Sequence, residues 1–307
     1  MVMQIMTGDS DFPNEARMAD HEGSLRVSSI GTNFEHYSSG LLASGEVPVR
    51  VLERGDIPPA LLATNEYMDT GKVLPDGCNP DGFVYGTGAG NVLGTLMLFD
   101  DVLPKAILSV DILPDAVLLG RATIALIRAS DGYDDFIGKI SSPSIFGTAV
   151  ESVIDEETSE KLKKLFSEVD VGSLSSDVSF AIEHVPDTGV VGRQRGRDVI
   201  SVFAVIREKW AQIKQLSDEQ NIGFGFSDFF EQKVLSYVAS LTDFSMRTNI
   251  IYTSNLADYL AWKKFKDSLE QLNREGNVFL LASRENDFNL VATQGVSSNP
   301  PQGLFLE

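Results

Sequence analysis

The sequence predicts an α/β protein built on a doubly wound, mostly parallel sheet that ends in an antiparallel hairpin. Three observations favour this fold. A short β-type run at 83–85 leads through a glycine-rich turn into an apolar helical stretch. Strand-like and helix-like segments then alternate up to residue 129, and the alternation resumes at 198. Such alternation is typical of parallel sheets, because each crossover between parallel strands needs a connection about as long as a helix.

The first half of this pattern is a strand–turn–helix–strand–helix unit. The helical stretch 91–99 is broken by Pro104, and the continuous apolar run 106–110 predicts a buried strand that ends at Asp111. A further helix is expected over 114–129. This unit supplies two neighbouring parallel strands and the turn between them.

The second half repeats the alternation with apolar residues at helical or strand spacing. Gly276 is placed to end the last helix. The expected elements are a helix over 199–213, a strand over 221–228, a helix over 230–241, a strand over 249–253, a helix over 256–272, a strand over 278–282 and a returning strand over 288–292.

Two regions fall outside this alternation. Residues 1–80 read as an N-terminal arm and pocket-covering segment, acidic and aperiodic at its start. Residues 130–197 are rich in Ser, Asp and Gly, show one amphipathic helix around 158–169, and read as an insertion that serves as a lid. The main domain is therefore expected to consist of 81–129 plus 198–307.

Composition narrows the classes of partner. A formal net charge of −19 repels phosphate backbones and disfavours a nucleic acid partner. One local exception is the arginine run Arg193, Arg195 and Arg197, either a solvated loop or a grip for an anionic substrate. No apolar stretch reaches the roughly 20 residues of a membrane span, and no secretory signal is evident. The single cysteine, Cys78, excludes an internal disulfide, and we expect a cytoplasmic protein without a metal site.

The glycine-rich turn Gly86-Thr87-Gly88-Ala89-Gly90 lets a ligand approach the backbone between a strand and a helix. Dinucleotide-binding folds use G-x-G-x-x-G at this place. That pattern fails here, because Asn91 or Leu93 stands where its third glycine is required. A nicotinamide-dependent oxidoreductase is therefore disfavoured.

The G-x-G-x-G spacing, with Asp111 at the end of the next strand 21 residues after Gly90, resembles motif I of the class I S-adenosylmethionine (SAM)-dependent methyltransferases. The resemblance implies a Rossmann-like fold in which the glycine turn wraps the amino-acid and ribose parts of SAM. It implies that Asp111 accepts hydrogen bonds from the ribose hydroxyls, with Ile112 against adenine. It covers roughly 81–129 and 198–293.

Two later positions extend the resemblance. Asp228 matches the polar residue that meets the adenine amino group, and Thr253-Ser254-Asn255 matches the fourth-strand end beside the transferred methyl group. The terminal hairpin is also a mark of the family. The cofactor residues implied are Tyr85, Gly86, Thr87, Gly88, Gly90, Asn91, Asp111, Ile112 and Asp228, and the acceptor-side residues are Thr253, Ser254 and Asn255.

The sequence departs from the family at Val84, where the family usually has an acid that contacts the SAM amino group. The fourth-strand end also lacks the Asn-Pro-Pro-Tyr type of motif, which disfavours methylation of bases. Structural roles compete with the functional ones. The glycines can form a plain tight turn, Asp111 and Asp228 can cap helices, and Asn255 with Asp258 fits a capping box.

The resulting hypothesis is in-line methyl transfer from SAM to a small-molecule or protein acceptor. Such a reaction needs alignment and exclusion of water more than a strong base. The alternatives are transfer of the aminocarboxypropyl group of SAM, which Val84 leaves open, and a non-catalytic methyltransferase-like binding module. The acceptor and the oligomeric state are not encoded in any pattern we recognise.

Overall fold

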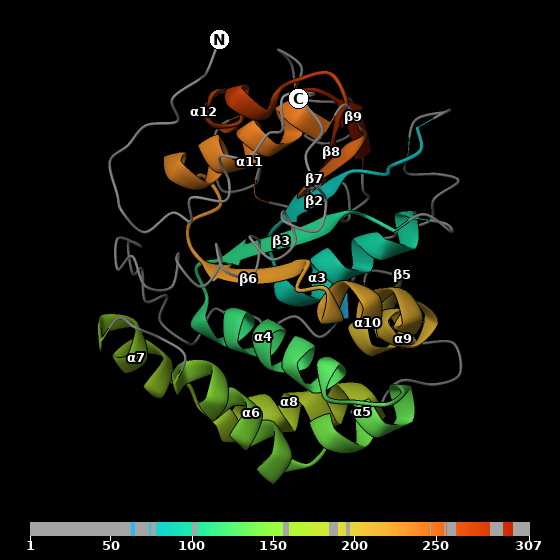
Figure 1. The fold of residues 1–307 in the computed structure, drawn as a ribbon, viewed down its shortest axis with the longest axis vertical. Helices are drawn as coiled ribbons and strands as arrows, with labels where there is room; N and C mark the ends of the chain where they lie inside the picture. Colours follow the sequence, from blue (N-terminus) through green and yellow to red (C-terminus); the bar gives the residue numbers. More distant parts are fainter. Residues whose placement is uncertain are drawn as a thin grey trace.

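The computed structural model describes residues 63–64, 74, 78–99, 103–155, 160–183, 190–194, 197–245, 247–254, 256, 262–282 and 291–296. Within this part of the chain, a central sheet lies between helices on both faces, and a further group of helices covers one of these layers from outside (Figure 1).

The central sheet has six strands in the order β6-β3-β2-β7-β8-β9. Every pairing is parallel except that of β8 with β9, which is antiparallel. The predicted mostly parallel sheet and its terminal antiparallel strand are thus confirmed. The strands are β2 (Phe83–Gly86), β3 (Ala106–Asp111), β6 (Ile222–Phe226), β7 (Asn249–Ser254), β8 (Asn277–Leu281) and β9 (Val291–Gln294).

Both faces of the sheet are buried, which explains why its strands read as continuous apolar runs. Successive side chains of a strand point to opposite faces. Val84 accordingly joins an apolar cluster with α3 (Ala89–Gly94), α4 (Pro114–Arg128), α9 (Val202–Glu208) and α10 (Trp210–Asp218). Tyr85 joins a second cluster with α11 (Gln232–Ser245), α12 (Trp262–Ser268) and the short 3-10 helix η5 (Glu270–Leu272).

Region 130–197 contains far more helix than its sequence predicted. It forms α5 (Tyr133–Ile140), α6 (Pro143–Asp155), α7 (Glu160–Ser167) and α8 (Val171–Glu183), which form an outer layer over α4 (Figure 1). The expectation of a single helix near 158–169 was wrong, although α7 falls within it. The high Ser and Gly content of the region made it resemble a loop. Its helices nevertheless bury an apolar stripe, namely Phe136, Ile140, Phe146 and Val150.

The outer helices also reach the edge of the sheet. Phe166 of α7 packs edge-on against Phe226 of β6, with ring centroids 5.6 Å apart. The Tyr133 hydroxyl of α5 donates to the Phe203 carbonyl of α9 at 3.1 Å. The region 130–197 is therefore part of the core rather than an appendage, and its role as a lid stays a prediction.

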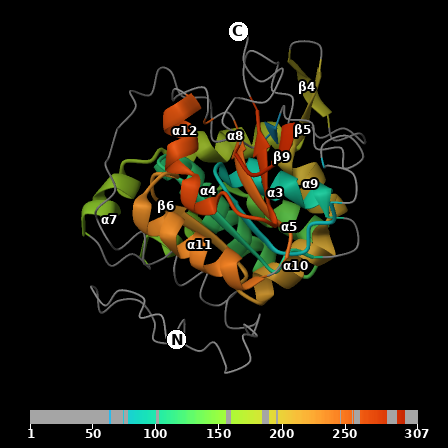
Figure 2. The ribbon, with the colours of Figure 1, turned by 90° about the horizontal axis from the view of Figure 1, so that it is seen from above.

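A small antiparallel sheet stands beside the main one, in the order β1-β5-β4. Its strands are β1 (Ala63–Thr64), β4 (Val190–Gln194) and β5 (Arg197–Ser201), and β4 extends away from the central sheet (Figure 2). The helix expected from residue 199 was wrong at its start. Residues 197–201 are a strand, and Ser201 caps α9 by accepting a hydrogen bond from the Phe203 backbone N–H at 3.2 Å.

Other element boundaries shift by a few residues. The expected helix 91–99 is α3 followed by a 3-10 turn, η3 (Thr95–Leu98), and α11 begins two residues later than expected. Gly276 does not end the last helix. It precedes β8 with φ +85, three residues after η5 and its cap. Among the described residues, no helix is long and apolar enough to cross a membrane.

Candidate ligand site at the carboxyl ends of the strands

The site predicted from the glycine turn lies where the winding of the sheet changes direction. The central strand β2 has β3 on one side and β7 on the other. The chain builds toward β6 on the first side and toward β9 on the second. In open α/β sheets, such a switch point leaves a crevice outside the carboxyl ends of the strands, where ligands bind. The turn after β2 and the end of β7 both lie there.

Two glycines of the turn are required for different reasons. A side chain on Gly86 would place its Cβ 2.7 Å from Val92 Cγ2 and 3.2 Å from Tyr252 Cβ, so this glycine allows α3 to pack directly on the strands. Gly88 has φ +78, which L-residues rarely adopt, and its position is not crowded. The turn is therefore built from close packing on its inner side and from a left-handed bend at Gly88.

Asp111 holds this turn from the neighbouring strand. Its carboxylate accepts a hydrogen bond from the Leu113 N–H at 2.9 Å. The Gly88 and Ile112 N–H groups and the Thr87 hydroxyl also act on it as donors that lower its pKa. Desolvation raises the pKa of Asp111 to about 6, although these hydrogen bonds act in the opposite direction. Asp111 is not the N-cap of α4, because Leu113 takes that position.

The contact between Asp111 and Thr87 was not foreseen from the sequence. The chain spacing predicted that Asp111 ends the adjacent strand, but the distance between the strand end and the turn depends on the register of β2 with β3. Gly86 pairs with Ser109, so β3 extends two residues further and brings Asp111 beside the turn.

Asn91 has an unmet hydrogen-bonding group next to the same turn. The residue is 6% exposed, and its side-chain oxygen is buried without a hydrogen-bond partner among the described residues. Its Cβ and Nδ2 lie 3.6 and 3.8 Å from where a Gly88 Cβ would stand. An unpaired buried acceptor costs about 1–3 kcal/mol and is rare in native proteins.

The end of β7 combines a satisfied hydroxyl with an unusual backbone. Thr253 is fully buried, and its hydroxyl donates to the Leu280 carbonyl at 3.0 Å, so it ties β7 to β8. Ser254 has φ +50, and the register with β8 is interrupted between Tyr252 and Ser254. A left-handed non-glycine residue at the end of a strand is a common feature of functional sites. The third predicted acceptor-side residue, Asn255, lies outside the described residues.

The remaining predicted cofactor residues lie at or near this end of the sheet. Tyr85 is buried, stacks on Phe229 with centroids 4.5 Å apart, and donates its hydroxyl to the Phe229 carbonyl at 2.7 Å. Asp228 accepts the Phe230 N–H at 2.8 Å and caps a turn ahead of α11. Gly90 is buried in α3, and Ile112 is half-buried. Tyr85 thus supports the loop after β6 from below.

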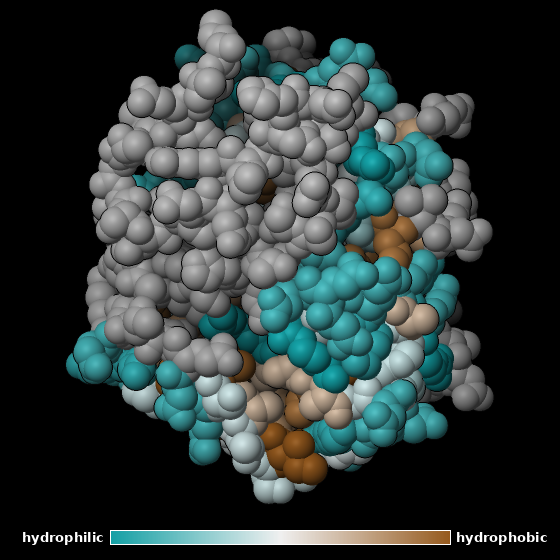
Figure 3. All heavy atoms as spheres, in the orientation of Figure 1, coloured by the Kyte–Doolittle hydropathy of each residue, from teal (hydrophilic) through white to brown (hydrophobic). Residues whose placement is uncertain are grey.

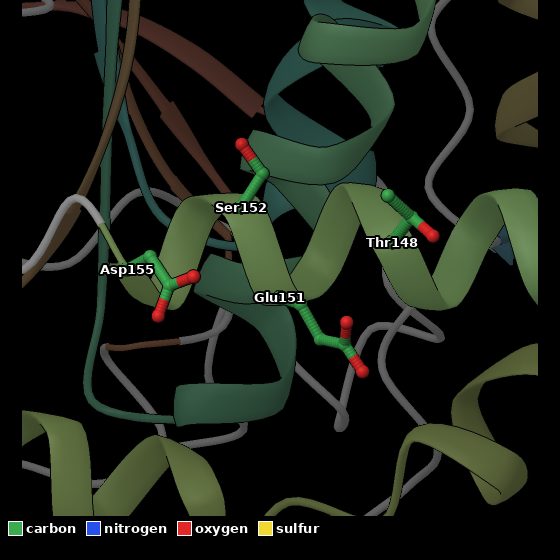
Figure 4. Close-up of a pocket in the computed structure, with 4 residues that line it drawn as sticks. All are labelled: Thr148, Glu151, Ser152 and Asp155. Carbon is green, nitrogen blue, oxygen red and sulfur yellow. The ribbon is translucent and has the colours of Figure 1, made fainter.

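Among the described residues, other chemical groups do not form a second site of this kind. A shallow depression along α6 is lined by Thr148, Glu151, Ser152 and Asp155, whose side chains point in different directions (Figure 4). All four are exposed, as expected of a solvated helix face. Within the described residues, no three His, Cys, Asp or Glu side chains stand close enough to hold a metal ion. Burial raises the pKa of the Cys78 thiol, which lowers its reactivity.

Comparison with known protein families identifies the family of this chain. A family profile described as a domain of unknown function, DUF7790, matches residues 104–300, well over half of the sequence. The chain belongs to the DUF7790 family. The region shared with DUF7790 includes Asp111, Asp228 and the end of β7, and it begins after the glycine turn. A search among curated proteins finds no match.

Proposed function

We propose that this protein binds SAM at the carboxyl ends of β2, β3 and β7, on a Rossmann-like domain, and transfers its methyl group to a small-molecule or protein acceptor. The observation that carries this proposal is the arrangement of Asp111 and the glycine turn. A carboxylate at the end of one parallel strand lies against a G-x-G-x-G turn at the end of the next, at the switch point of the sheet.

The described residues fit such a ligand on three counts. Gly88 presents backbone without a side chain at a position where a Cβ would meet no atom closer than 3.6 Å. Asn91 offers a buried acceptor that finds no donor in the part of the chain that the structure describes. Asp111 is a carboxylate whose partners are all donors, as the hydroxyls of a ribose would be.

In this proposal Asp111 orients the ribose, and the glycine turn follows the amino-acid side of the ligand. SAM, when bound, supplies an electrophilic methyl group on a sulfonium. The end of β7 would then line the acceptor side, where Ser254 leaves the regular strand geometry. Methyl transfer by in-line displacement requires alignment of the acceptor and exclusion of water, and both are tasks for a rigid turn and its covering segments.

Calorimetric titration with SAM and S-adenosylhomocysteine, with NAD as the negative control, tests the proposal. We expect micromolar affinity for the adenosyl compounds and none for NAD. Asp111→Ala should weaken binding at least 100-fold, because it removes a charged acceptor from both ribose hydroxyls.

Asp218→Asn is the matched control, because Asp218 is an exposed carboxylate at the end of α10 that pairs with Lys214 at 2.6 Å. This variant should bind as the wild type does. Failure of the folded wild type to bind either adenosyl compound would refute the proposal and favour a non-catalytic binding module.

One observation favours a second reaction of the same ligand. Val84 occupies the position where the methyltransferase family usually has its acid, and it is fully buried in the apolar cluster beneath α3. The amino-acid end of the ligand is then held differently, which is compatible with transfer of the aminocarboxypropyl group. Product analysis separates the two reactions, because methyl transfer yields S-adenosylhomocysteine and aminocarboxypropyl transfer yields methylthioadenosine.

A further inference from the structure

The β2 strand has no side chain with which to recognise a positively charged group at the glycine turn. Val84 and Gly86 lie on the same face of the strand, and that face is packed against α3. The next position is Tyr85, whose hydroxyl is already bonded to the Phe229 carbonyl. An ammonium group brought to this turn must find its acceptor on another element.

Asp111 is poorly placed to be that acceptor. Its carboxylate accepts the Leu113 N–H at 2.9 Å, and the Gly88 N–H and the Thr87 hydroxyl of the turn also favour its ionised form. In the proposed function, Asp111 also accepts hydrogen bonds from the two ribose hydroxyls, and a carboxylate offers about four acceptor positions. An ammonium group would compete with those hydroxyls for the same carboxylate.

Asn91 is the acceptor that remains. It lies one turn of α3 beyond Gly88, and its Cβ and Nδ2 stand 3.6 and 3.8 Å from where a Gly88 Cβ would be. More than nine-tenths of the residue is buried, and its oxygen meets no donor among the described residues. A native protein retains such an unpaired acceptor where an external group completes it.

We infer that the Asn91 side-chain oxygen accepts a hydrogen bond from the ammonium group of the ligand's amino-acid end, in place of the acid that Val84 replaces. This inference rests on the proposed function. Asn91 thereby makes the site specific for adenosyl compounds that carry an α-amino group, while Asp111 recognises the nucleoside part that all of them share.

Two ligands that differ in their amino-acid end test the hydrogen bond to Asn91. S-adenosylhomocysteine carries the amino-acid end, and methylthioadenosine has the same nucleoside without it. For Asn91→Leu, which keeps the volume and removes the carbonyl, we expect a loss of about 10- to 100-fold in affinity for S-adenosylhomocysteine, the range for a hydrogen bond to a charged group. Affinity for methylthioadenosine should change less than twofold.

Asn91→Asp should retain the affinity for S-adenosylhomocysteine, because a carboxylate accepts the same hydrogen bond and adds electrostatic attraction to the ammonium group. This variant should bind S-adenosylhomocysteine at least as well as the wild type does. Asn91→Ala serves as a second deletion in case leucine does not fit, and circular dichroism verifies that each variant is folded.

Equal losses for both ligands in Asn91→Leu and Asn91→Ala, or no loss for either, would overturn the role of Asn91 and leave SAM binding intact. If the folded wild type binds neither ligand, the proposed function itself fails. The two failures are thus distinguishable in one set of titrations.

Discussion

The two ends of the central sheet differ in how completely their polar groups are satisfied. At the end where the parallel strands begin, buried amides bond to one another and to the backbone. At the end where they finish, a left-handed glycine, a left-handed serine, a partly desolvated carboxylate and an unpaired amide oxygen lie close to the switch point. A left-handed serine outside any helix end, beside an unmet acceptor and a carboxylate of raised pKa, is typical of a protein that gives up stability where it binds a ligand.

Asn249 is the centre of the satisfied end. Its side-chain oxygen accepts the Phe83 N–H at 2.9 Å, and its Nδ2 donates to the Asn277 oxygen at 2.9 Å. It thus joins the starts of β2, β7 and β8. Nearby, Asp81 accepts from the Thr248 N–H at 3.1 Å and pairs with Arg247 at 2.9 Å. One exception is the Asn221 oxygen, which is buried and unpaired before β6.

A positive φ has a different meaning at each end. Gln220 has φ +59, but it directly follows α10, and the N–H groups of Gln220 and Asn221 bond back to Ser217 and Leu216. This is the Schellman arrangement that ends many helices. Ser254, with φ +50, is instead the last residue of β7, just after an interruption in the register with β8. Helix termination explains the positive φ of Gln220, whereas that of Ser254 has no such cause, and the role of Ser254 in the site stays a prediction.

The largest expected effect is at the satisfied end. Asn249→Ala removes the buried acceptor of the Phe83 N–H and the buried donor to the Asn277 oxygen, and we expect it to lower the free energy of unfolding by about 2–4 kcal/mol. Chemical denaturation measures this loss. Gln215→Ala, which removes an exposed side-chain hydrogen bond to Glu219, is the control and should cost less than about 0.5 kcal/mol. Equal effects of the two variants would show that the network does not stabilise the sheet.

The next effect is a pH dependence at the other end. Burial raises the pKa of Asp111 from 3.8 to about 6, so the folded state binds a proton more tightly than the unfolded state does. This stabilisation is complete below pH 3.8 and is lost as the pH rises through 6. Relative to Asp111→Asn, the wild type should lose up to about 3 kcal/mol between pH 4 and pH 8.

Denaturation of the wild type and Asp111→Asn across this pH range measures the difference. A ribose whose hydroxyls donate to Asp111 favours the ionised carboxylate. Ligand affinity should therefore rise with pH through about 6 in the wild type and stay flat in Asp111→Asn. A pH-independent difference in stability would mean that Asp111 keeps an ordinary pKa.

A third, smaller effect concerns the turn itself. Gly88→Ala meets no steric obstacle, since the nearest atom to the new Cβ is 3.6 Å away, and its cost comes from φ +78 alone. We expect a loss of about 1–2 kcal/mol in the free energy of unfolding. Thermal unfolding checks the value. A neutral substitution would show that the turn has an alternative conformation open to any residue.

The smallest effect has the opposite sign. Gly147 lies within α6, has ordinary helical geometry and has no atom within 4 Å of a Cβ built on it. Gly147→Ala should therefore stabilise the protein by about 0.5–1 kcal/mol and leave ligand binding unchanged. Thermal unfolding of the two glycine variants side by side separates a glycine needed for its backbone angle from one that is not. A loss of stability in Gly147→Ala would assign that glycine a role on the outer helical layer.

That outer layer shows where sequence reasoning fell short. Apolar residues gather at its lower surface among polar ones (Figure 3), and Ile145 and Phe180 are 42% and 58% exposed. The helices α6 and α8 contain several Ser, Gly and Asp residues, and α5 contains Asp and Gly, so their local composition resembles that of a loop. The stability of α5 and α6 comes from burial of one stripe against α4, and that of α8 from packing on α6; these partners are not visible in the sequence around the helices.

The sequence by itself determined the strands β2, β3, β6, β7 and β8 and the place of the glycine turn, because apolar runs bounded by turn residues are local signals. It also determined that Asp111 follows a buried strand. Only the tertiary structure decided the strand order, the four-helix layer over α4 and the bonding of Asp111 to Thr87 and Gly88. The lack of a partner for the Asn91 side-chain oxygen among the described residues is likewise seen only in the tertiary structure. These features depend on which segments meet in space, and contacts between residues far apart in the chain leave no periodic trace in the sequence.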